Sequence, residues 1–500
     1  MNPPIRTLTL VSMPWPLYDR PSIQLGTLKA YLAAQMPQVT VQAVHFYLKV
    51  AAEVGYDLYR AISKRTWLAE SVYAALLFPQ RRERIEKIFR REARKDATLR
   101  HMDFDQVCSR VAKASQGLIN GVDWQKSDLV GFSVCLCQLT ASLYAIKKIK
   151  KRFSSLPVVV GGSMFSGNQA SGLVRCFPEV DFVVNGEGER PLTALVRFLN
   201  ADHGTPRPSS LPAVAGRADL TGDTHQAFDQ MDDLDGLPPP DYDDYFALLK
   251  SMGPDKAFFP TLPAEISRGC WWRSGKAARK VKGCAFCNLN LQWDGYRSKQ
   301  TGQVVAEIDH LTTRYQVLSV AFTDNLLPAR RSKEIFQRLS TLGKDMRFFA
   351  EVRATIPYPV LKAMKDAGTH ELQIGIEALS TNLLKKLNKG TTAIQNLEAM
   401  KSCEELGIAH HSNLILYFPA SDAQDVEQTL RTLEFALPFQ PLRCVAFWLG
   451  LGSPGWLNPQ AFGLKAVLNH PNYRALFPQE IFRHMTFMIQ SYQNGLGYQM

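Results

Sequence analysis

Residues 128–162 (DLVGFSVCLCQLTASLYAIKKIKKRFSSLPVVVGG) decide the fold of the first half of the chain. They begin with a buried-strand run at 128–134, continue into a helix at 139–153, and return to a strand at 157–161. Strands joined by one crossover helix pair in parallel, so the stretch predicts a doubly wound α/β sheet. Ligands bind such sheets at the carboxyl ends of the strands.

The same alternation extends on both sides of this stretch. Further candidate strands lie at 6–12, 39–46 and 180–185, with helices at 22–34 and near 170–177. A mainly helical, partly basic stretch at about 49–118 interrupts the pattern. We therefore expect residues 1–202 to form one Rossmann-like domain with a helical insertion.

The second half of the chain repeats the α/β pattern after a break. Residues 203–245 are rich in Pro, Gly and Asp, which predicts a linker or strap over 203–260. Six candidate strands follow, at 263–267, 317–323, 347–352, 371–377, 411–418 and 443–449. Six βα units predict a partial TIM-type (β/α)6 barrel over 261–460, with chemistry at the strand ends and a short C-terminal segment at 461–500.

Composition excludes several classes of protein. The chain has 46% hydrophobic and 21% charged residues, which is typical of a folded protein rather than a disordered one. No apolar stretch approaches the roughly 20 residues that span a bilayer, and the start lacks the apolar core of a signal peptide. We therefore expect a cytoplasmic protein with no membrane partner, whose nine cysteines form no disulfide framework.

The net charge of +12 raises the question of a nucleic-acid partner. The densest basic run, residues 81–100, interleaves four acidic residues with its cations and places Ile85, Ile88 and Phe89 on one helical face. This pattern favours a solvated amphipathic helix, with a docking surface for an acidic partner as the alternative. The sequence shows no appended nucleic-acid module, so we do not expect a nucleic-acid partner.

The most specific local signal is a group of three cysteines, Cys270, Cys284 and Cys287. Three thiolates suit a [4Fe–4S] cluster, because the fourth iron then stays open for a ligand. Cys270 follows the first barrel strand, where catalytic groups gather. A structural zinc site is the alternative, but zinc favours a fourth Cys or His, and none lies between 246 and 308.

The segments around these cysteines carry a family resemblance. SRGCWW (267–272), CAFCNLN (284–290) and YRSK (296–299) resemble the first-strand motif of radical S-adenosylmethionine (SAM) enzymes. More narrowly, they resemble the cobalamin-binding radical SAM proteins that mature ribosomally made peptides. In that family the first two cysteines lie more than three residues apart. Here thirteen residues intervene, Trp271 to Gly283, and the loop is basic.

The resemblance continues along the barrel and implies a site for SAM. FTDNLLP (322–328), EVRA (351–354) and LQIGIEALSTNLLKKLNKGTT (372–392) resemble the second, third and fourth strand regions of the family. By this likeness Glu351, Arg353 and Glu377 hold the amino, carboxylate and ribose groups of SAM. A zwitterionic ligand needs both an acid and a guanidinium, although each residue taken singly also suits a surface ion pair.

The first domain resembles the cobalamin-binding domain of the same family, through residues 131–153, 157–169 and 177–192. The likeness implies these cofactor-lining residues: Ser133, Gln138, Gly161, Gly162, Ser163, Gly186, Glu187, Gly188 and Glu189. The chain has no Asp-x-His-x-x-Gly signature, so the likeness implies cobalamin bound without histidine ligation. Gln138 could lie under the cobalt, or its amide could bond the backbone at a helix start.

The function that the resemblance implies is methylation of an unactivated carbon in a precursor peptide, through a 5′-deoxyadenosyl radical and methylcobalamin. Its partners would be that peptide and an external electron donor such as flavodoxin or ferredoxin. Three alternatives stay open: cyclisation or oxidation on the same framework without methyl transfer, an RNA-modifying radical enzyme, and a non-catalytic binding protein that lacks the cluster.

Overall fold

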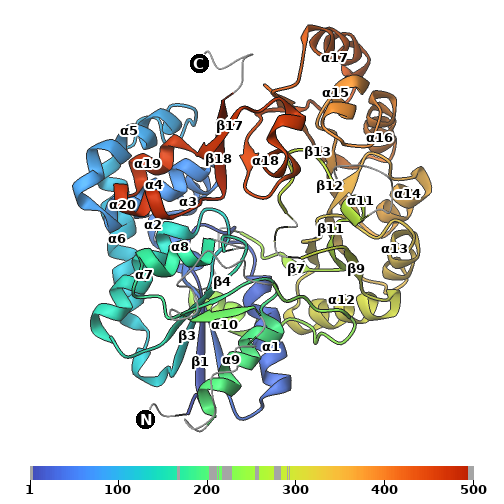
Figure 1. Cartoon of the computed structure of the whole chain (residues 1–500). Coiled ribbons are helices and arrows are strands. Elements are labelled where there is room, and N and C mark those ends of the chain that lie inside the picture. The colour runs from blue at the N-terminus through green and yellow to red at the C-terminus, as the bar shows by residue number, and fades with distance from the viewer. Residues whose placement is uncertain are drawn as a thin grey trace. The chain divides into compact units, whose positions relative to one another are not determined.

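The structure is a computed structural model of the chain. It describes residues 4–165, 169–201, 211, 213–216, 228–253, 258–274, 283–289, 291 and 293–493. The chain divides into two compact units, each built from several segments (Figure 1). The first unit comprises Met1–Met231, Leu237–Phe259 and His470–Met488, and the second comprises Asp232–Gly236, Pro260–Asn469 and Ile489–Met500. No helix in the described ranges is long and apolar enough to cross a membrane.

A six-stranded sheet in the order β2-β1-β3-β4-β5-β6 forms the centre of the first unit. Its strands are β1 (Thr7–Ser12), β2 (Thr40–His45), β3 (Leu129–Ser133), β4 (Val158–Gly161), β5 (Phe182–Val184) and β6 (Val214–Gly216). The first five run parallel, and β6 pairs antiparallel with β5. The predicted doubly wound α/β sheet is confirmed, and β6 adds an antiparallel edge.

Helices cover both faces of this sheet. On one face α1 (Ile23–Gln35) and α9 (Glu189–Asn200) bury a core with the strands, which includes Leu25, Leu195 and Val159. The other face carries α7 (Leu139–Arg152), which packs against α4 (Thr66–Leu77) of the insertion. Remaining helices of the unit are α8 (Gln169–Cys176), α10 (Asp243–Ser251), α19 (Pro471–Leu476) and α20 (Gln479–His484).

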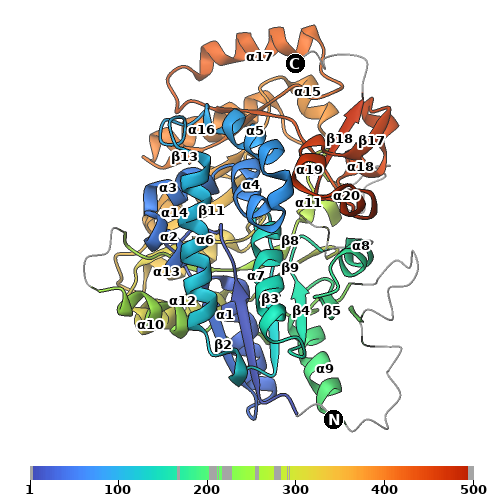
Figure 2. The ribbon, with the colours of Figure 1, turned by 90° about the vertical axis from the view of Figure 1, so that its left-hand side faces the viewer.

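The helical insertion is present at the predicted place. It consists of α2 (Phe46–Val54), α3 (Tyr56–Ser63), α4, α5 (Arg82–Ala93) and α6 (Phe104–Gly121), and α4, α5 and α6 lie side by side (Figure 2). The buried carboxylate of Glu70 on α4 accepts hydrogen bonds from the Leu139 and Thr140 amides at the start of α7, at 3.2 and 2.9 Å. An acid at a helix N-terminus satisfies free amides, so this contact fastens the insertion to the sheet.

Part of the segment predicted as a linker is folded into the first unit. Asp244 on α10 accepts a hydrogen bond from the Ala43 amide at 2.8 Å and pairs with Lys29 at 2.6 Å. The Tyr242 ring packs on Gly26 so closely that a Cβ there would lie 2.5 Å from it. Of the two alternatives predicted for this segment, a linker or a strap, this part of it is a packed strap.

The second unit contains a parallel sheet in the order β13-β12-β11-β10-β7 and a parallel pair, β14 and β15. These strands are β7 (Leu262–Ala264), β10 (Ser319–Phe322), β11 (Arg347–Arg353), β12 (Thr369–Gly375), β13 (Ala409–His411), β14 (Asn413–Leu416) and β15 (Arg443–Ala446). The bridge between Glu377 and Leu414 joins the two sets. The six predicted strands are thus present in chain order, with the fifth divided at Ser412.

Helices alternate with these strands, and two small antiparallel sheets complete the unit. The helices are α11 (Trp271–Ser274), α12 (Thr301–Tyr315), α13 (Ser332–Ser340), α14 (Tyr358–Asp366), α15 (Thr381–Lys386), α16 (Ala393–Glu405), α17 (Ala423–Ala436) and α18 (Pro454–Leu457). The small sheets are formed by β8 (Ser267–Gly269) with β9 (Tyr296–Ser298), and by β16 (Leu449–Gly450), β18 (Ile489–Gln493) and β17 (Ala466–Asn469).

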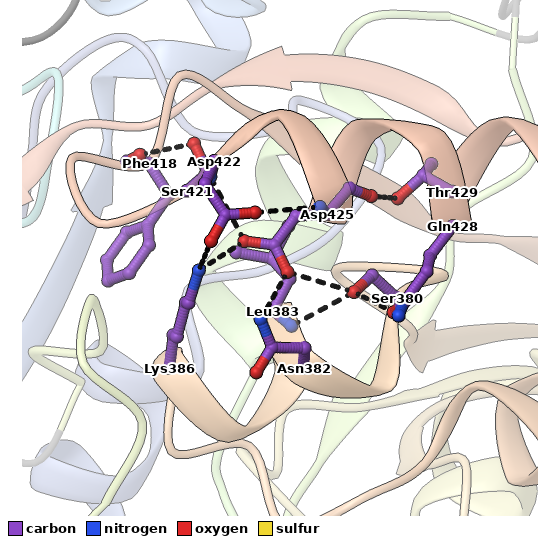
Figure 3. A network of polar contacts seen from close by, with 10 residues as sticks. All are labelled: Ser380, Asn382, Leu383, Lys386, Phe418, Ser421, Asp422, Asp425, Gln428 and Thr429. Atoms are coloured by element: carbon purple, nitrogen blue, oxygen red, sulfur yellow. Dashed lines mark hydrogen bonds and ion pairs between the residues drawn. The ribbon is translucent and has the colours of Figure 1, made fainter.

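A polar network fixes α15 against the start of α17 (Figure 3). The buried Asp425 carboxylate accepts hydrogen bonds from Ser380 Oγ at 3.1 Å and Asn382 Nδ2 at 2.9 Å, and it pairs with Lys386 at 2.6 Å. Asp425 also forms a reciprocal capping box with Asp422. The network therefore holds α15 at both ends, and the segment that follows α15 reaches the candidate site.

Candidate active site in the second unit

The strand that leads to Cys270 is fastened by a buried carboxylate. Asp324, just after β10, accepts hydrogen bonds from the Ile266 amide at 3.0 Å and from Ser267 Oγ at 2.6 Å. Burial raises the pKa of Asp324 to about 7, although these hydrogen bonds favour its charged form. A Cβ at Gly269, where φ is +92°, would overlap the Gly295 carbonyl, so only glycine fits directly before Cys270.

The loop that carries Cys284 and Cys287 is held by main-chain bonds on two sides. The amide of buried Ala285 donates to the Leu387 carbonyl at 2.9 Å, at the end of α15. Its carbonyl accepts from the Gly455 amide at 2.8 Å, in α18. Segments after the fourth and sixth strands thus fix Ala285, the first of the two residues between Cys284 and Cys287.

The three cysteines lie in one electrostatic neighbourhood. Burial raises the pKa of Cys284, and burial, together with the charges of Cys284 and Cys270, raises the pKa of Cys287 to about 12. The cations of Lys389 and Arg353 oppose the shift at Cys284, because positive charge favours the thiolate. Within the described ranges, no three His, Cys, Asp or Glu side chains already stand at metal-ligating geometry. The three thiols therefore interact electrostatically and lie near two cations, but their sulfur atoms are not at the spacing of metal ligands.

Glu377 lies two residues after β12 in a left-handed backbone conformation. Its φ is +63°, and its backbone exchanges hydrogen bonds with Asn413 and Ile415 at 2.9 and 2.8 Å. The Glu377 carboxylate pairs with the Lys389 ammonium at 3.1 Å, and both side chains are largely buried. Burial alone would lower the pKa of Lys389, but the charges of Glu377 and Cys284 raise it. Lys389 therefore stays charged beside the cysteines.

The guanidinium of Arg353 packs against the two tryptophans that follow Cys270. Its guanidinium carbon lies 4.6 Å from the ring centre of Trp272 and 5.5 Å from that of Trp271. Its Nη2 donates a hydrogen bond to the Lys389 carbonyl, and its buried Nε has no hydrogen-bond partner among the described residues. The structure thus gives Arg353 a packing role and leaves one donor for a ligand.

Glu351 is the acid of this group that stands alone. Among the described residues it makes no hydrogen bond or ion pair, in contrast to Glu377. Burial and the nearby Glu377 carboxylate raise the pKa of Glu351 to about 7, and Lys389 opposes this shift. Glu351, Arg353 and Glu377, predicted from sequence, are thus linked through Lys389, which sequence reasoning missed although it lies within the quoted stretch 372–392.

The residues predicted to line a cofactor in the first unit lie at the carboxyl ends of β3, β4 and β5. Ser163 and Leu136 are exposed at the ends of neighbouring strands. Gln138 is buried, and its amide accepts from the Cys135 amide at 2.9 Å and donates to the Met13 carbonyl at 2.5 Å. Of the two roles open to Gln138, the structure shows the backbone-bonding one.

The glycine turns of the first unit have a structural reason of their own. Gly162 (φ +108°) would place a Cβ 2.6 Å from the Val134 carbonyl oxygen, whereas Gly161 has room for one. A Cβ at Gly186 would overlap the Asp229 carbonyl, and Glu187 accepts a hydrogen bond from the Met231 amide at 2.6 Å. The turn Gly186–Glu189 therefore anchors residues 228–231, and its contact with a cofactor remains a prediction.

Comparison with known proteins defines the class. Residues 265–433 match the Radical SAM superfamily. The chain is 26% identical over 373 residues to "Uncharacterized methyltransferase PH0819" of Pyrococcus horikoshii, covering 72% of this chain and 75% of that protein. It is 24% identical over 310 residues to the hopanoid C-3 methylase of Methylococcus capsulatus, covering 59% of this chain and 54% of the methylase, about half its length.

A solved structure resembles both units together. The radical S-adenosylmethionine methyltransferase TsrM from Kitasatospora setae, with cobalamin and a [4Fe–4S] cluster bound, superposes with a TM-score of 0.64 at 15% identity. The match covers 98% of this chain and 88% of TsrM, which supports the two-part α/β fold. The family match places residues 265–433, which lie in the second unit, in the Radical SAM superfamily.

Proposed function

We propose that the chain is a cobalamin-dependent radical SAM methyltransferase. It binds a [4Fe–4S] cluster and SAM in the second unit and cobalamin in the first. The observation that carries this is the gathering of Cys284, Lys389, Glu377 and Arg353 at the strand ends of the superfamily domain. Relatives named methyltransferase and methylase support methyl transfer, and two relatives named anaerobic magnesium-protoporphyrin IX monomethyl ester cyclase, 25% and 23% identical, keep cyclisation as the second candidate.

The residues of the second unit fit the cluster and SAM. Three cysteines beside two cations match the donor set of a cluster with one open iron. The unbonded carboxylate of Glu351 suits the ammonium of SAM, and Lys389 and the free Nε of Arg353 suit its carboxylate. When bound, the cluster supplies the electron that opens SAM and cobalamin supplies the methyl group. The chain itself orients these groups and excludes water.

The substrate is, by the sequence resemblance alone, a residue of a ribosomally made precursor peptide. The same resemblance gives an external electron donor, such as flavodoxin or ferredoxin, as the partner that reduces the cluster. Product mass distinguishes the alternatives, because methylation adds a methyl group and cyclisation removes hydrogen.

Anaerobic reconstitution with iron, sulfide and hydroxocobalamin, followed by desalting and metal analysis, tests the proposal. About four iron atoms and about one cobalt per chain are expected. Iron without cobalt would remove the methyltransferase half of the proposal, and zinc in place of iron would remove both halves.

The pKa of Glu351 leads to a pH-dependent affinity for SAM. A carboxyl with a pKa of about 7 is protonated below that pH, so its attraction for the ammonium is lost as pH falls. We expect affinity, measured by calorimetry on the reconstituted chain, to weaken by up to about tenfold from pH 7.5 to pH 6. Glu351→Gln should bind weakly with no such slope. An equal slope in wild type and Glu351→Gln would contradict the assignment.

Gly455 is expected to be essential for the cysteine loop. A Cβ at this position would lie 2.9 Å from the Ala285 carbonyl oxygen, closer than real Cβ atoms approach, and the neighbour is backbone that cannot swing away. Gly455→Ala should displace Ala285 and lower the iron retained after reconstitution to below half of the wild-type value. Gly302→Ala, at an exposed glycine of α12 with open space around it and no left-handed φ, is the control for a change of the same size.

A further inference from the structure

The loop between Cys270 and Cys284 is long, and the structure describes both of its ends. Thirteen residues separate the two cysteines. Trp271 and Trp272 follow Cys270 directly, and Gly283 precedes Cys284 directly, while residues 275–282 lie outside the described part of the chain. Holding together the two ends of a loop of this length costs conformational entropy.

One residue contacts both ends of this loop. The carbonyl of Asn388 accepts a hydrogen bond from Trp272 Nε1 at 2.8 Å. The side-chain amide of the same residue donates a hydrogen bond to the Gly283 carbonyl at 2.6 Å. Asn388 thus bridges the residue two places after Cys270 and the residue directly before Cys284.

The local fold presets Asn388 for these contacts. It follows α15, and its φ of +51° is in the left-handed region that asparagine tolerates better than most residues. Its own amide donates to the Lys385 carbonyl at 2.9 Å. Because the Asp425 network fixes α15, the position of Asn388 does not depend on the loop that it contacts.

Two further contacts fix the Trp272 ring, which donates one of the two hydrogen bonds that Asn388 makes to the loop ends. The guanidinium of Arg353 lies over one face of its ring, with 4.6 Å from the Arg353 Cζ to the ring centre. A Cβ at Gly390 (φ +71°) would overlap the ring, so glycine is what lets the indole pack against this segment. The Trp272 ring is therefore held in one position by Arg353, at the end of β11, and by Gly390, after α15.

We propose that Asn388 is a clasp that fixes both ends of the long loop, so that the spacing of Cys270 and Cys284 does not depend on the loop between them. It is a positioning residue, since it acts on the cluster through Trp272 and Gly283. This inference rests on the proposed function, because the cysteines it positions are the cluster ligands. The clasp closes the loop in the apo protein, so cluster binding does not have to bear the entropy of closure.

Three variants of the full chain test the clasp. Asn388→Gly keeps the positive φ and removes only the side-chain amide. Asn388→Asp keeps an αL-tolerant residue but places a carboxylate against the Gly283 carbonyl. The control is Gln316→Gly, at a helix end with a similar φ of +53° in the same unit. A further variant replaces residues 275–282 with a Gly-Ser spacer of half that length.

The readouts are the rate of iron release to a chelator, the electron paramagnetic resonance (EPR) spectrum of the reduced cluster with and without SAM, and the melting temperature of the apo protein. We expect Asn388→Gly to release iron about tenfold faster and Asn388→Asp faster still, with altered EPR spectra and an unchanged apo melting temperature. Gln316→Gly and the shortened loop should match wild type.

The outcomes separate the two claims. Wild-type release rates in both Asn388 variants would overturn the clasp, and so would loss of iron in the shortened-loop variant. A lower apo melting temperature in step with faster release would reassign Asn388 to general stability. Absence of iron from the wild-type chain would instead overturn the proposed function.

Discussion

The substitution Cys284→Ser is expected to abolish the iron–sulfur cluster. Cys284 is buried and lies within electrostatic reach of Cys270 and of the Lys389 and Arg353 cations, so water does not easily replace its sulfur. Two remaining cysteines cannot hold a cubane that needs three. Reconstituted Cys284→Ser should therefore retain less than about one iron per chain, against about four for wild type, as measured by iron and sulfide analysis.

Cys444 provides the matched control for this experiment. It is an exposed cysteine on β15 of the same unit, and Cys444→Ser should retain the full iron content and the wild-type visible spectrum. If Cys284→Ser kept about four iron atoms, or if Cys444→Ser lost them equally, the three-cysteine assignment would be wrong.

The second large effect is expected at the buried pair of Glu377 and Lys389. Glu377→Gln leaves the Lys389 ammonium buried without its counter-charge, and removal of one partner from such a pair costs about 3–5 kcal/mol. For a unit of this size that corresponds to a fall of roughly 6–20 °C in melting temperature. Differential scanning calorimetry of the apo chain measures it, because two units can give separate transitions.

The double variant Glu377→Gln/Lys389→Met separates stability from ligand binding. Replacing both charges removes the unpaired ammonium, so most of the lost stability should return. Affinity for SAM should not return, because both groups that would contact the ligand are gone. A single variant as stable as wild type, or a double variant that binds SAM normally, would show that the pair has neither role.

The strand pattern allowed most of the fold to be predicted. Runs such as 128–134 and 371–377 have the length and apolar pattern of buried strands, and such runs predicted five strands of the first half and six of the second. The antiparallel edge strand β6 was not predicted. The segment 203–260 was harder to predict, because Pro, Gly and Asp suit a loose linker and a packed strap equally. Only tertiary contacts distinguish a linker from a strap, and one of them is the hydrogen bond from the Ala43 amide to Asp244.

Sequence identified the site residues that stand at strand ends and missed those that reach the site by a local turn. Glu351 lies near the carboxyl end of β11 and Glu377 lies just after β12, so their place could be inferred. Lys389 lies beyond a short helix, and it meets Glu377 only because that residue adopts a left-handed φ. The contact of Gly455 with Ala285 joins residues 170 positions apart, which no local pattern encodes.

The most direct test of the central claim is the fate of SAM on the reconstituted, chemically reduced chain. Liquid chromatography with mass detection should show 5′-deoxyadenosine formed by wild type and none formed by Cys284→Ser. With hydroxocobalamin present, S-adenosylhomocysteine should form as well. Intact SAM in the presence of a fully loaded and reduced cluster would contradict the assignment of this chain as a radical SAM methyltransferase.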